Sequence, residues 1–190
     1  TDLLALFENS FSDATISLSQ LTGREMTIQK RSDLELISGE TLINRIGEKM
    51  DETCFGSLIK TNADIHSNIV FVVDEKDGLG LYDIICGNAE GTSTQADQDV
   101  IKAMGEINNI LSSSFINHVA NYSKKEIHPS VPQSKYDMLG AIMEGVILQD
   151  EMNDKKILCA DTIISEKGKE GFHTRMFIMT EKQELEKLVS

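Results

Sequence analysis

The stretch that decides the fold is EINNILSSSFIN, residues 106–117, because it sets a polar pair within an apolar helical repeat. Apolar residues recur every three or four positions on both sides of it, which is typical of the buried face of an amphipathic helix. These residues are Val100, Met104, Ile107, Leu111, Phe115 and Val119. The pattern predicts a helix over residues 98–122 with this stripe buried.

The polar pair consists of Glu106 and Asn109, which are one helical turn apart. At 100° per residue both lie on the face turned away from the apolar stripe, so their side chains project next to each other. Lys102 and Ser113 fall on the same face. Outer faces of helices are normally polar, so an ordinary surface role is the alternative interpretation. Pro132 follows Asn109 after 22 intervening residues and completes a Glu-x2-Asn-x22-Pro pattern.

The two halves of the chain carry similar sequences. Residues 71–76 (FVVDEK) and 177–182 (FIMTEK) are 106 positions apart, and each predicts a strand that runs into a helix. Residues 21–26 and 122–127 are 101 positions apart, and each predicts a helix end that passes into a strand. This period is longer than a solenoid unit, so it indicates duplication within one fold. We expect a single domain over residues 1–190, with repeats at about 1–90 and 97–190.

Each half is expected to form a long helix, a strand, a shorter helical or extended connection, two strands that form a hairpin, and a closing helix. The strand candidates are 25–37, 54–61, 69–73, 157–165 and 173–179. The polar, glycine-bearing segment 166–171 predicts a hairpin turn, and 87–99 predicts the linker between repeats. The expected fold class is α+β, with pseudo-two-fold helix–strand repeats whose long exposed helices pack on an antiparallel sheet.

Composition excludes several classes of partner. With 18 basic and 31 acidic residues the formal net charge is −13, which disfavours nucleic acids and anionic membrane surfaces. No apolar run approaches the roughly 18 to 20 residues that a membrane span requires. The first residues lack the charged-then-apolar pattern of a signal peptide. We therefore expect a cytoplasmic protein.

The sequence gives no sign of a metal or cofactor site. Cys54, Cys86 and Cys159 are isolated, so neither a disulfide framework nor a zinc site is indicated, and buried thiols are expected. The four histidines lack the short helical spacing of metal ligands. No Ser-His-Asp or Cys-His arrangement is recognisable either. We expect no cofactor that belongs to this chain.

The polar helix resembles the signature helix of the CheC/CheX/FliY family of chemotaxis phosphatases, whose pattern is Asp/Ser-x3-Glu-x2-Asn-x22-Pro. Glu106, Asn109 and Pro132 match this pattern at the required spacing. Residues 106–111 are similar to the family's Glu-Ile-Gly-Asn-Ile run, and residues 136–142 resemble the stretch after the proline in CheC. The resemblance covers most of residues 50–190 and is fainter in the first half, where 18–24 still resembles the family's first helix.

Two departures from the family pattern stand out. Lys102 occupies the Asp/Ser position, so we expect partner preference or the level of activity to differ from that of the family. Members of the CheC type often carry a second copy of the motif in the first half. The offset of 101 residues places Ala5 and Glu8 where that second Glu and Asn would be, so we expect the first site to be lost.

The resemblance implies a hydrolase that ends a chemotaxis signal by dephosphorylating the phospho-aspartate of a CheY-type response regulator. An acyl phosphate is already activated, so its hydrolysis chiefly requires a positioned water and stabilised charge. Asn109 would orient the water, because a carboxamide offers both an acceptor and donors. By the same resemblance, Glu106 would pair with a lysine of the regulator, and the regulator would supply the magnesium ion.

Two other classes of function remain open. The first is a non-catalytic binding module of the same fold, for a phosphorylated receiver, a CheD-like deamidase or a flagellar switch component. Lys102 and the lost first site favour this alternative. The second is a purely structural oligomerisation domain, which is supported only by the absence of other catalytic motifs.

Overall fold

The computed structural model describes residues 3–147 and 155–189. The first half contains helices α1 (Leu3–Thr22), α2 (Gly39–Ile46) and α3 (Glu75–Cys86), a 3-10 turn at Gly47–Lys49, and strands β1 (Met26–Lys30), β2 (Glu35–Ser38), β3 (Thr53–Ala63) and β4 (Ser67–Asp74). The second half contains helices α4 (Gln98–Ser123), α5 (Leu139–Ile147) and α6 (Lys182–Val189), and strands β5 (Ile127–Pro129), β6 (Gln133–Met138), β7 (Lys155–Glu166) and β8 (Phe172–Glu181).

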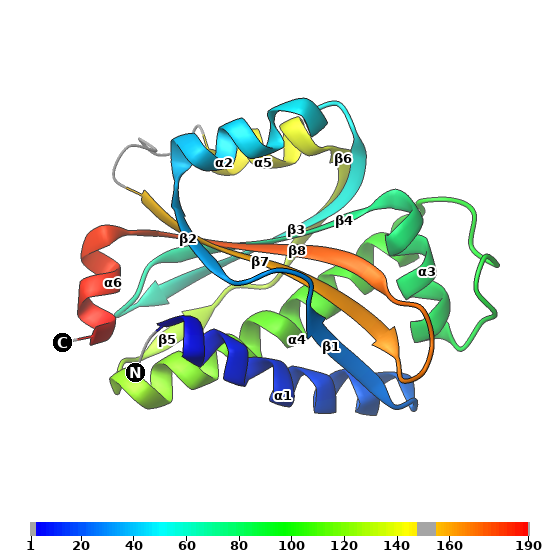
Figure 1. Ribbon diagram of the computed structural model, residues 1–190, viewed down its shortest axis with the longest axis horizontal. Coiled ribbons are helices and arrows are strands. Elements are labelled where there is room, and N and C mark those ends of the chain that lie inside the picture. The colour runs from blue at the N-terminus through cyan, green and yellow to red at the C-terminus, as the bar shows by residue number, and fades with distance from the viewer. Residues whose placement is uncertain (1–2, 148–154, 190) are drawn as a thin grey trace.

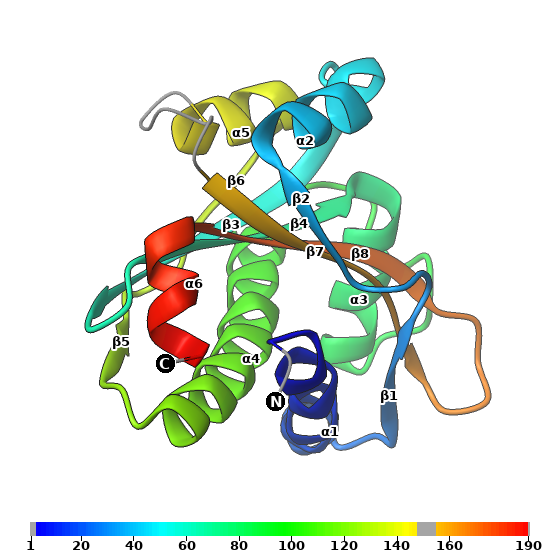
Figure 2. The same ribbon diagram turned by 60° about the vertical axis from the view of Figure 1, so that its left-hand side comes forward.

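The elements form three layers, with an eight-stranded antiparallel sheet between two layers of helices. This arrangement confirms the expected α+β class. Figure 1 shows α1 and α4 side by side on one face of the sheet and α2 and α5 on the other. Figure 2 shows the same layers from another side, with α3 and α6 flanking α4. None of the helices within the described ranges combines the length and apolar character that crossing a membrane requires.

Both halves follow one order of elements, namely helix, two strands, helix, two strands, helix. The sheet order is β1-β7-β8-β4-β3-β5, with β2 also on β7 and β6 also on β3. The counterparts in the two halves are β1 and β5, β2 and β6, β3 and β7, and β4 and β8. Exchanging each strand for its counterpart gives the same sheet order in reverse. At the centre Phe71 pairs with Met176 and Val70 with Phe177, so the matching residues Phe71 and Phe177 flank a local two-fold axis. A superposition of residues 2–87 on 98–189 would test the division into repeats, which stays a prediction.

One predicted strand is wrong in its extent. Residues 25–37 form two strands, β1 and β2, because the exposed polar residues Arg31, Ser32 and Asp33 interrupt the ladder. Both strands pair with β7, but the register moves from Met26 opposite Glu166 to Glu35 opposite Cys159. The other strand candidates lie within the observed strands, and the hairpin turn lies between β7 and β8 as expected.

The sheet separates two apolar cores, because alternate residues of a strand point to opposite faces. Phe71 faces α1 and α4, whereas its neighbour Val72 faces α2 and α5. On the α4 side, the rings of Phe7 in α1 and Phe115 in α4 meet edge to face at 5.0 Å. This packing holds the long helices against each other and against the sheet, so the outer surface of α4 has a fixed orientation.

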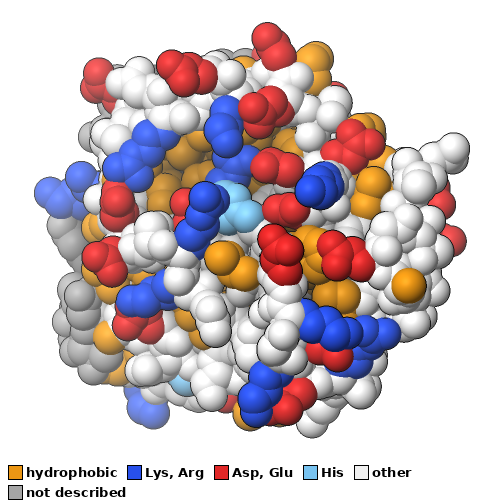
Figure 3. Space-filling view, turned by 45° about the vertical axis from the view of Figure 1, so that its right-hand side comes forward, with side chains coloured by type: hydrophobic (Ala, Val, Ile, Leu, Met, Phe, Trp, Pro, Cys, Tyr) orange, Lys and Arg blue, Asp and Glu red, His pale blue; other side chains and the backbone are white. Residues whose placement is uncertain are grey.

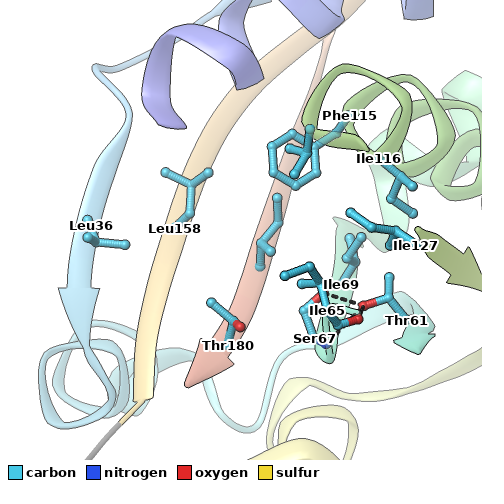
Figure 4. Close-up of a pocket in the computed structure, with 12 residues that line it drawn as sticks. Leu36, Thr61, Ile65, Ser67, Ile69, Phe115, Ile116, Ile127, Leu158 and Thr180 are labelled. Carbon is cyan, nitrogen blue, oxygen red and sulfur yellow. Dashed lines mark hydrogen bonds between the residues drawn. The ribbon is translucent and has the colours of Figure 1, made fainter. Parts of the chain in front are cut away.

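A small apolar cavity lies on the α4 side of the sheet (Figure 4). Phe115 and Ile116 of α4 close it from one side, and the strands close it from the other. At its edge the Thr61 and Ser67 hydroxyls are 2.9 Å apart and hydrogen-bonded. Its volume of about 30 Å³ leaves room for no more than a few waters, so it is a packing space of the core.

The predicted linker forms a loop between α3 and α4 that a buried carboxylate organises. Asp83 of α3 is fully buried and accepts the backbone N–H groups of Thr92 at 3.0 Å and Ser93 at 3.1 Å. Burial alone would raise the pKa of the Asp83 carboxyl, but the hydrogen bonds from the loop outweigh it and hold this pKa below its ordinary value of 3.8. Asp97 then begins α4 by accepting the N–H groups of Asp99 and Val100.

We expect Asp83→Asn to lower the free energy of unfolding by about 1–3 kcal/mol at neutral pH, because charge-assisted bonds to the loop are weakened. The folded pKa is depressed, so the stabilisation is fully present above the unfolded pKa and is lost as the pH falls through the folded value. The penalty should therefore be equal at pH 7 and pH 5 and smaller below pH 3.8. Urea unfolding of both proteins across this range measures it, and a penalty that grows on acidification would contradict the assignment.

Candidate functional site

Helix α4 presents the predicted site on its solvent-facing side. The whole predicted apolar stripe is buried, from Val100 to Val119. On the opposite side Lys102 and Glu106 are exposed, and Asn109 and Ser113 are half-buried. The helix thus places the Glu106 carboxylate and the Asn109 amide one turn apart on a surface that another molecule can reach.

The polar groups of this pair are free. Among the residues that the structure describes, neither the Glu106 carboxylate nor the Asn109 amide has a hydrogen-bond or ion-pair partner. Polar side chains that stabilise a fold are normally paired, and half-buried ones more so. An unpaired carboxylate beside an unpaired amide therefore leaves acceptors and donors available for a ligand or a partner protein.

The adjacent Asn108 has the opposite role and was not anticipated from the sequence. Its side chain is fully buried, and its Nδ2 donates to the backbone oxygen and to Oγ of Ser57, both at 3.1 Å. Ser112 Oγ donates to Asn108 Oδ1 at 2.8 Å, and Ser134 Oγ donates to Ser57 Oγ at 3.0 Å. This network ties the turn of α4 that carries Glu106 and Asn109 to strands β3 and β6.

Pro132 reaches the same turn from the other side. A Cβ atom on Gly105 would lie 2.5 Å from Ser134 Oγ and 3.7 Å from the Cβ of Pro132, so the helix backbone touches the start of β6 here. Glycine at this position allows the close approach, because a larger residue would displace the Ser134 side chain. The structure therefore brings the proline of the motif beside the turn that bears Glu106, although 22 residues separate Pro132 from Asn109.

The corresponding positions of α1 differ. Ala5 is half-buried and offers no polar group, and the exposed Glu8 carboxylate forms an ion pair with Lys30 of β1. Arg31 stands 23 positions after Glu8, where the motif would have proline, and its guanidinium bonds to His173. The first half thus has neither the free pair nor the proline.

No cluster of three metal-binding side chains occurs within the described part of the chain. The expectation of three buried thiols is wrong for Cys86, which is exposed, while Cys54 is buried and Cys159 is half-buried. Burial raises the pKa of the Cys54 and Cys159 thiols to about 12, so neither forms a reactive thiolate near neutral pH.

Comparison with known proteins finds similarities in sequence and in fold. No protein-family model matches the chain. The chain is 22% identical over 175 residues to the CheY-P phosphatase CheC of Bacillus subtilis, covering 90% of this chain and 83% of CheC. Its fold is similar to that of Thermotoga maritima FliY, with a TM-score of 0.73, 14% identity, and coverage of 95% of this chain and 88% of that one.

A further similarity is to FliM in the FliG–FliM complex from H. pylori, with a TM-score of 0.67, 10% identity, and coverage of 98% of this chain and 94% of that one. The fold matches along nearly the full described length in both solved structures. At 90% coverage the sequence match to CheC spans both halves of this chain and includes α4. The chain is therefore similar in sequence to CheC, and its fold is that of the CheC/CheX/FliY proteins.

Proposed function

We propose that this protein dephosphorylates the phospho-aspartate of a CheY-type response regulator and thereby ends a chemotaxis signal. The observation that carries the proposal is the free Glu106–Asn109 pair on the solvent-facing side of α4. The relation to a CheY-P phosphatase supports the same reaction class. The described residues contain no metal cluster, and this is compatible with the proposed chemistry because the receiver would bring both the phosphoryl group and the magnesium ion.

In this proposal Asn109 positions the attacking water. The water oxygen forms a bond to phosphorus, the bond between phosphorus and the aspartyl oxygen breaks, and the products are inorganic phosphate and the free regulator carboxylate. The Asn109 oxygen accepts a hydrogen bond from the water, and its NH₂ group donates toward the phosphoryl region. The buried network at Asn108 keeps this turn from rotating, so the amide needs little reorganisation when the regulator docks.

Glu106 would fix the docking register. Its exposed carboxylate projects from the same side of α4 as Asn109 and can pair with a lysine of the receiver. Such a pair at an interface chiefly sets orientation and encounter rate. Lys102 lies one turn before Glu106 and adds a positive charge at the edge of the same surface, which would act on the receiver's acidic groups.

A second candidate function is a non-catalytic binding module. The FliG–FliM complex shows that the same fold can serve in a protein assembly, and Lys102 departs from the phosphatase pattern. Such a module would hold a phosphorylated receiver, a CheD-like deamidase or a flagellar switch component without changing the phosphate.

Single-turnover decay of a phosphorylated CheY-type receiver from the same genome separates the two candidates. The phosphatase proposal expects this protein to accelerate the decay in proportion to its concentration. The binding module expects an unchanged or slower decay, together with measurable complex formation. Decay that is unchanged at saturating concentrations of this protein would overturn the catalytic proposal.

We expect the double variant Ala5→Ser/Glu8→Gln to retain at least about half of the parent's acceleration, because α1 holds no working pair. Glu8 contributes an exposed ion pair with Lys30, and such pairs are worth little stability. The same decay assay measures the effect, with circular dichroism as the check on folding. A large loss of activity in a folded double variant would place the working site in the first half.

A further inference from the structure

A second hollow lies away from α4, on the opposite face of the sheet. It is formed by α2, by the segment between β1 and β2, and by β7 and β8, and its volume is about 350 Å³. We call it the α2 cavity. Ligand pockets in proteins are roughly 300–1,000 Å³, so a small molecule would fit. Its floor is apolar and comes from Leu42 and Ile46 of α2 and from Phe177 of β8.

Basic residues outnumber acidic ones in the walls of the α2 cavity, whereas acidic residues outnumber basic ones in the whole sequence. Acidic residues outnumber basic ones by 31 to 18 over the whole sequence. The cavity is nevertheless lined by four cations, Arg31, Arg45, Lys49 and Arg175, against three carboxylates. Figure 3 shows a hollow with hydrophobic side chains at its bottom and both basic and acidic side chains around it. The floor of the cavity is apolar, and its walls carry one more positive charge than negative charges. This arrangement suits a ligand that has one apolar end and one anionic end.

The cations keep donors for such a ligand. Arg45 bonds to Glu35 at 2.5 Å through Nη2, and Arg175 bonds to Asp74 at 2.9 Å through Nη2. A guanidinium carries five N–H donors in a planar fork, so each arginine retains several after one ion pair. Within the described ranges the Lys49 ammonium has no ion-pair or hydrogen-bond partner.

A hydrogen-bonded chain holds the fourth cation in place. Arg31 Nη1 lies 3.1 Å from His173 Nδ1, and because a guanidinium can only donate, this ring nitrogen accepts. The Nε2–H group of His173 then donates to Asp161 Oδ1 at 3.1 Å. Asp161, His173 and Arg31 all line the cavity, so these two hydrogen bonds hold the Arg31 guanidinium at the cavity wall.

We propose that the α2 cavity binds a small organic anion, with an apolar body against Leu42, Ile46 and Phe177 and a carboxylate, phosphate or sulfonate head between Arg45 and Lys49. Bidentate hydrogen bonds from arginine favour such planar or tetrahedral oxyanions. The counterpart cavity under α5, of about 320 Å³, has two lysines and no arginine in its lining, so it lacks this recognition element. The site is independent of the phosphatase proposal.

The test uses two dyes with the same aromatic body. 1-Anilinonaphthalene-8-sulfonate carries an anionic head, and N-phenyl-1-naphthylamine lacks it. Fluorescence titration gives their affinities, and ¹H–¹⁵N amide shifts give the location. We expect saturable binding of the sulfonate with shifts in residues 31–49 and 159–177, and affinity at least about tenfold weaker for the neutral dye.

The variant Arg45→Gln/Lys49→Gln should weaken binding of the sulfonate about tenfold. Arg24→Gln/Lys167→Gln is the matched control, because it also removes two positive charges, from exposed or half-exposed ion pairs with Glu166 and Glu25 outside the cavity. This control should stay within about twofold of the parent. Equal affinities for the two dyes, equal losses in the two variants, or shifts confined to α5 and β6 would each overturn the proposal.

Discussion

Asn109→Ala is expected to remove almost all acceleration of receiver dephosphorylation, a loss on the order of a hundredfold, because one positioned group orients the attacking water. The variant should remain folded, since Asn109 is half-buried and its amide has no partner among the described residues. The decay of phosphorylated receiver, measured at saturating concentrations of each protein, reports the catalytic step and not the docking.

Asn117→Ala is the matched control for this variant. Asn117 is an exposed amide on the same helix, about two turns beyond Asn109, so its loss should leave the decay rate unchanged. Glu106→Ala should instead raise the concentration needed for half-maximal acceleration as well as slow turnover, because its task is docking. If Asn109→Ala and the parent protein accelerate the decay equally, Asn109 does not position the water and the binding module becomes the better assignment.

The second large effect concerns stability. Asn108→Ala is expected to lower the free energy of unfolding by about 2–4 kcal/mol, because it removes the buried hydrogen bonds that Asn108 forms with Ser57 and Ser112 and opens a small cavity. Urea unfolding followed by circular dichroism measures the change.

Asn117→Ala serves again as the comparison, with an expected change within about 0.5 kcal/mol because the side chain is exposed. Ser57→Ala should produce a loss of the same order as Asn108→Ala, since it removes the partner hydroxyl of both Asn108 and Ser134. Equal stabilities of the Asn108 and Asn117 variants would show that the buried network does not anchor α4.

Periodicity predicted the long elements well. The helix expected at 98–122 is α4 at Gln98–Ser123, because its apolar stripe recurs over about five turns and no proline interrupts it. Glu106 is exposed and Asn109 is half-buried, so both lie outside the buried stripe, as expected. Their catalytic role stays a prediction. Local pattern was sufficient here because burial of one helix face follows directly from the spacing of its residues.

Features that depend on distant partners were missed. Strand β6 was not predicted and exists because β3 offers it a hydrogen-bonding edge, whereas the passage from helix to strand at residues 122–127, where β5 begins, was expected. Asn108 is polar yet buried, and only its encounter with Ser57, 51 positions earlier, makes this favourable. The α2 cavity likewise combines side chains near residues 31–49 with others near 159–177. Sequence spacing cannot reveal contacts of this kind, although adjacent asparagines with a serine four residues later were a usable signal.

The interleaved sheet order has a consequence for how the chain folds. Strand β7 borders β1 and β2 of the first half, and β3 borders β5 and β6 of the second, so each hairpin receives its outer strands from the other half. Met26 meets its partner Glu166 only after most of the chain has been synthesised. Such long-range pairing slows folding and makes it cooperative. A cut in the loop at 87–97 would separate every hairpin from its outer strands, so the two fragments should acquire structure only together.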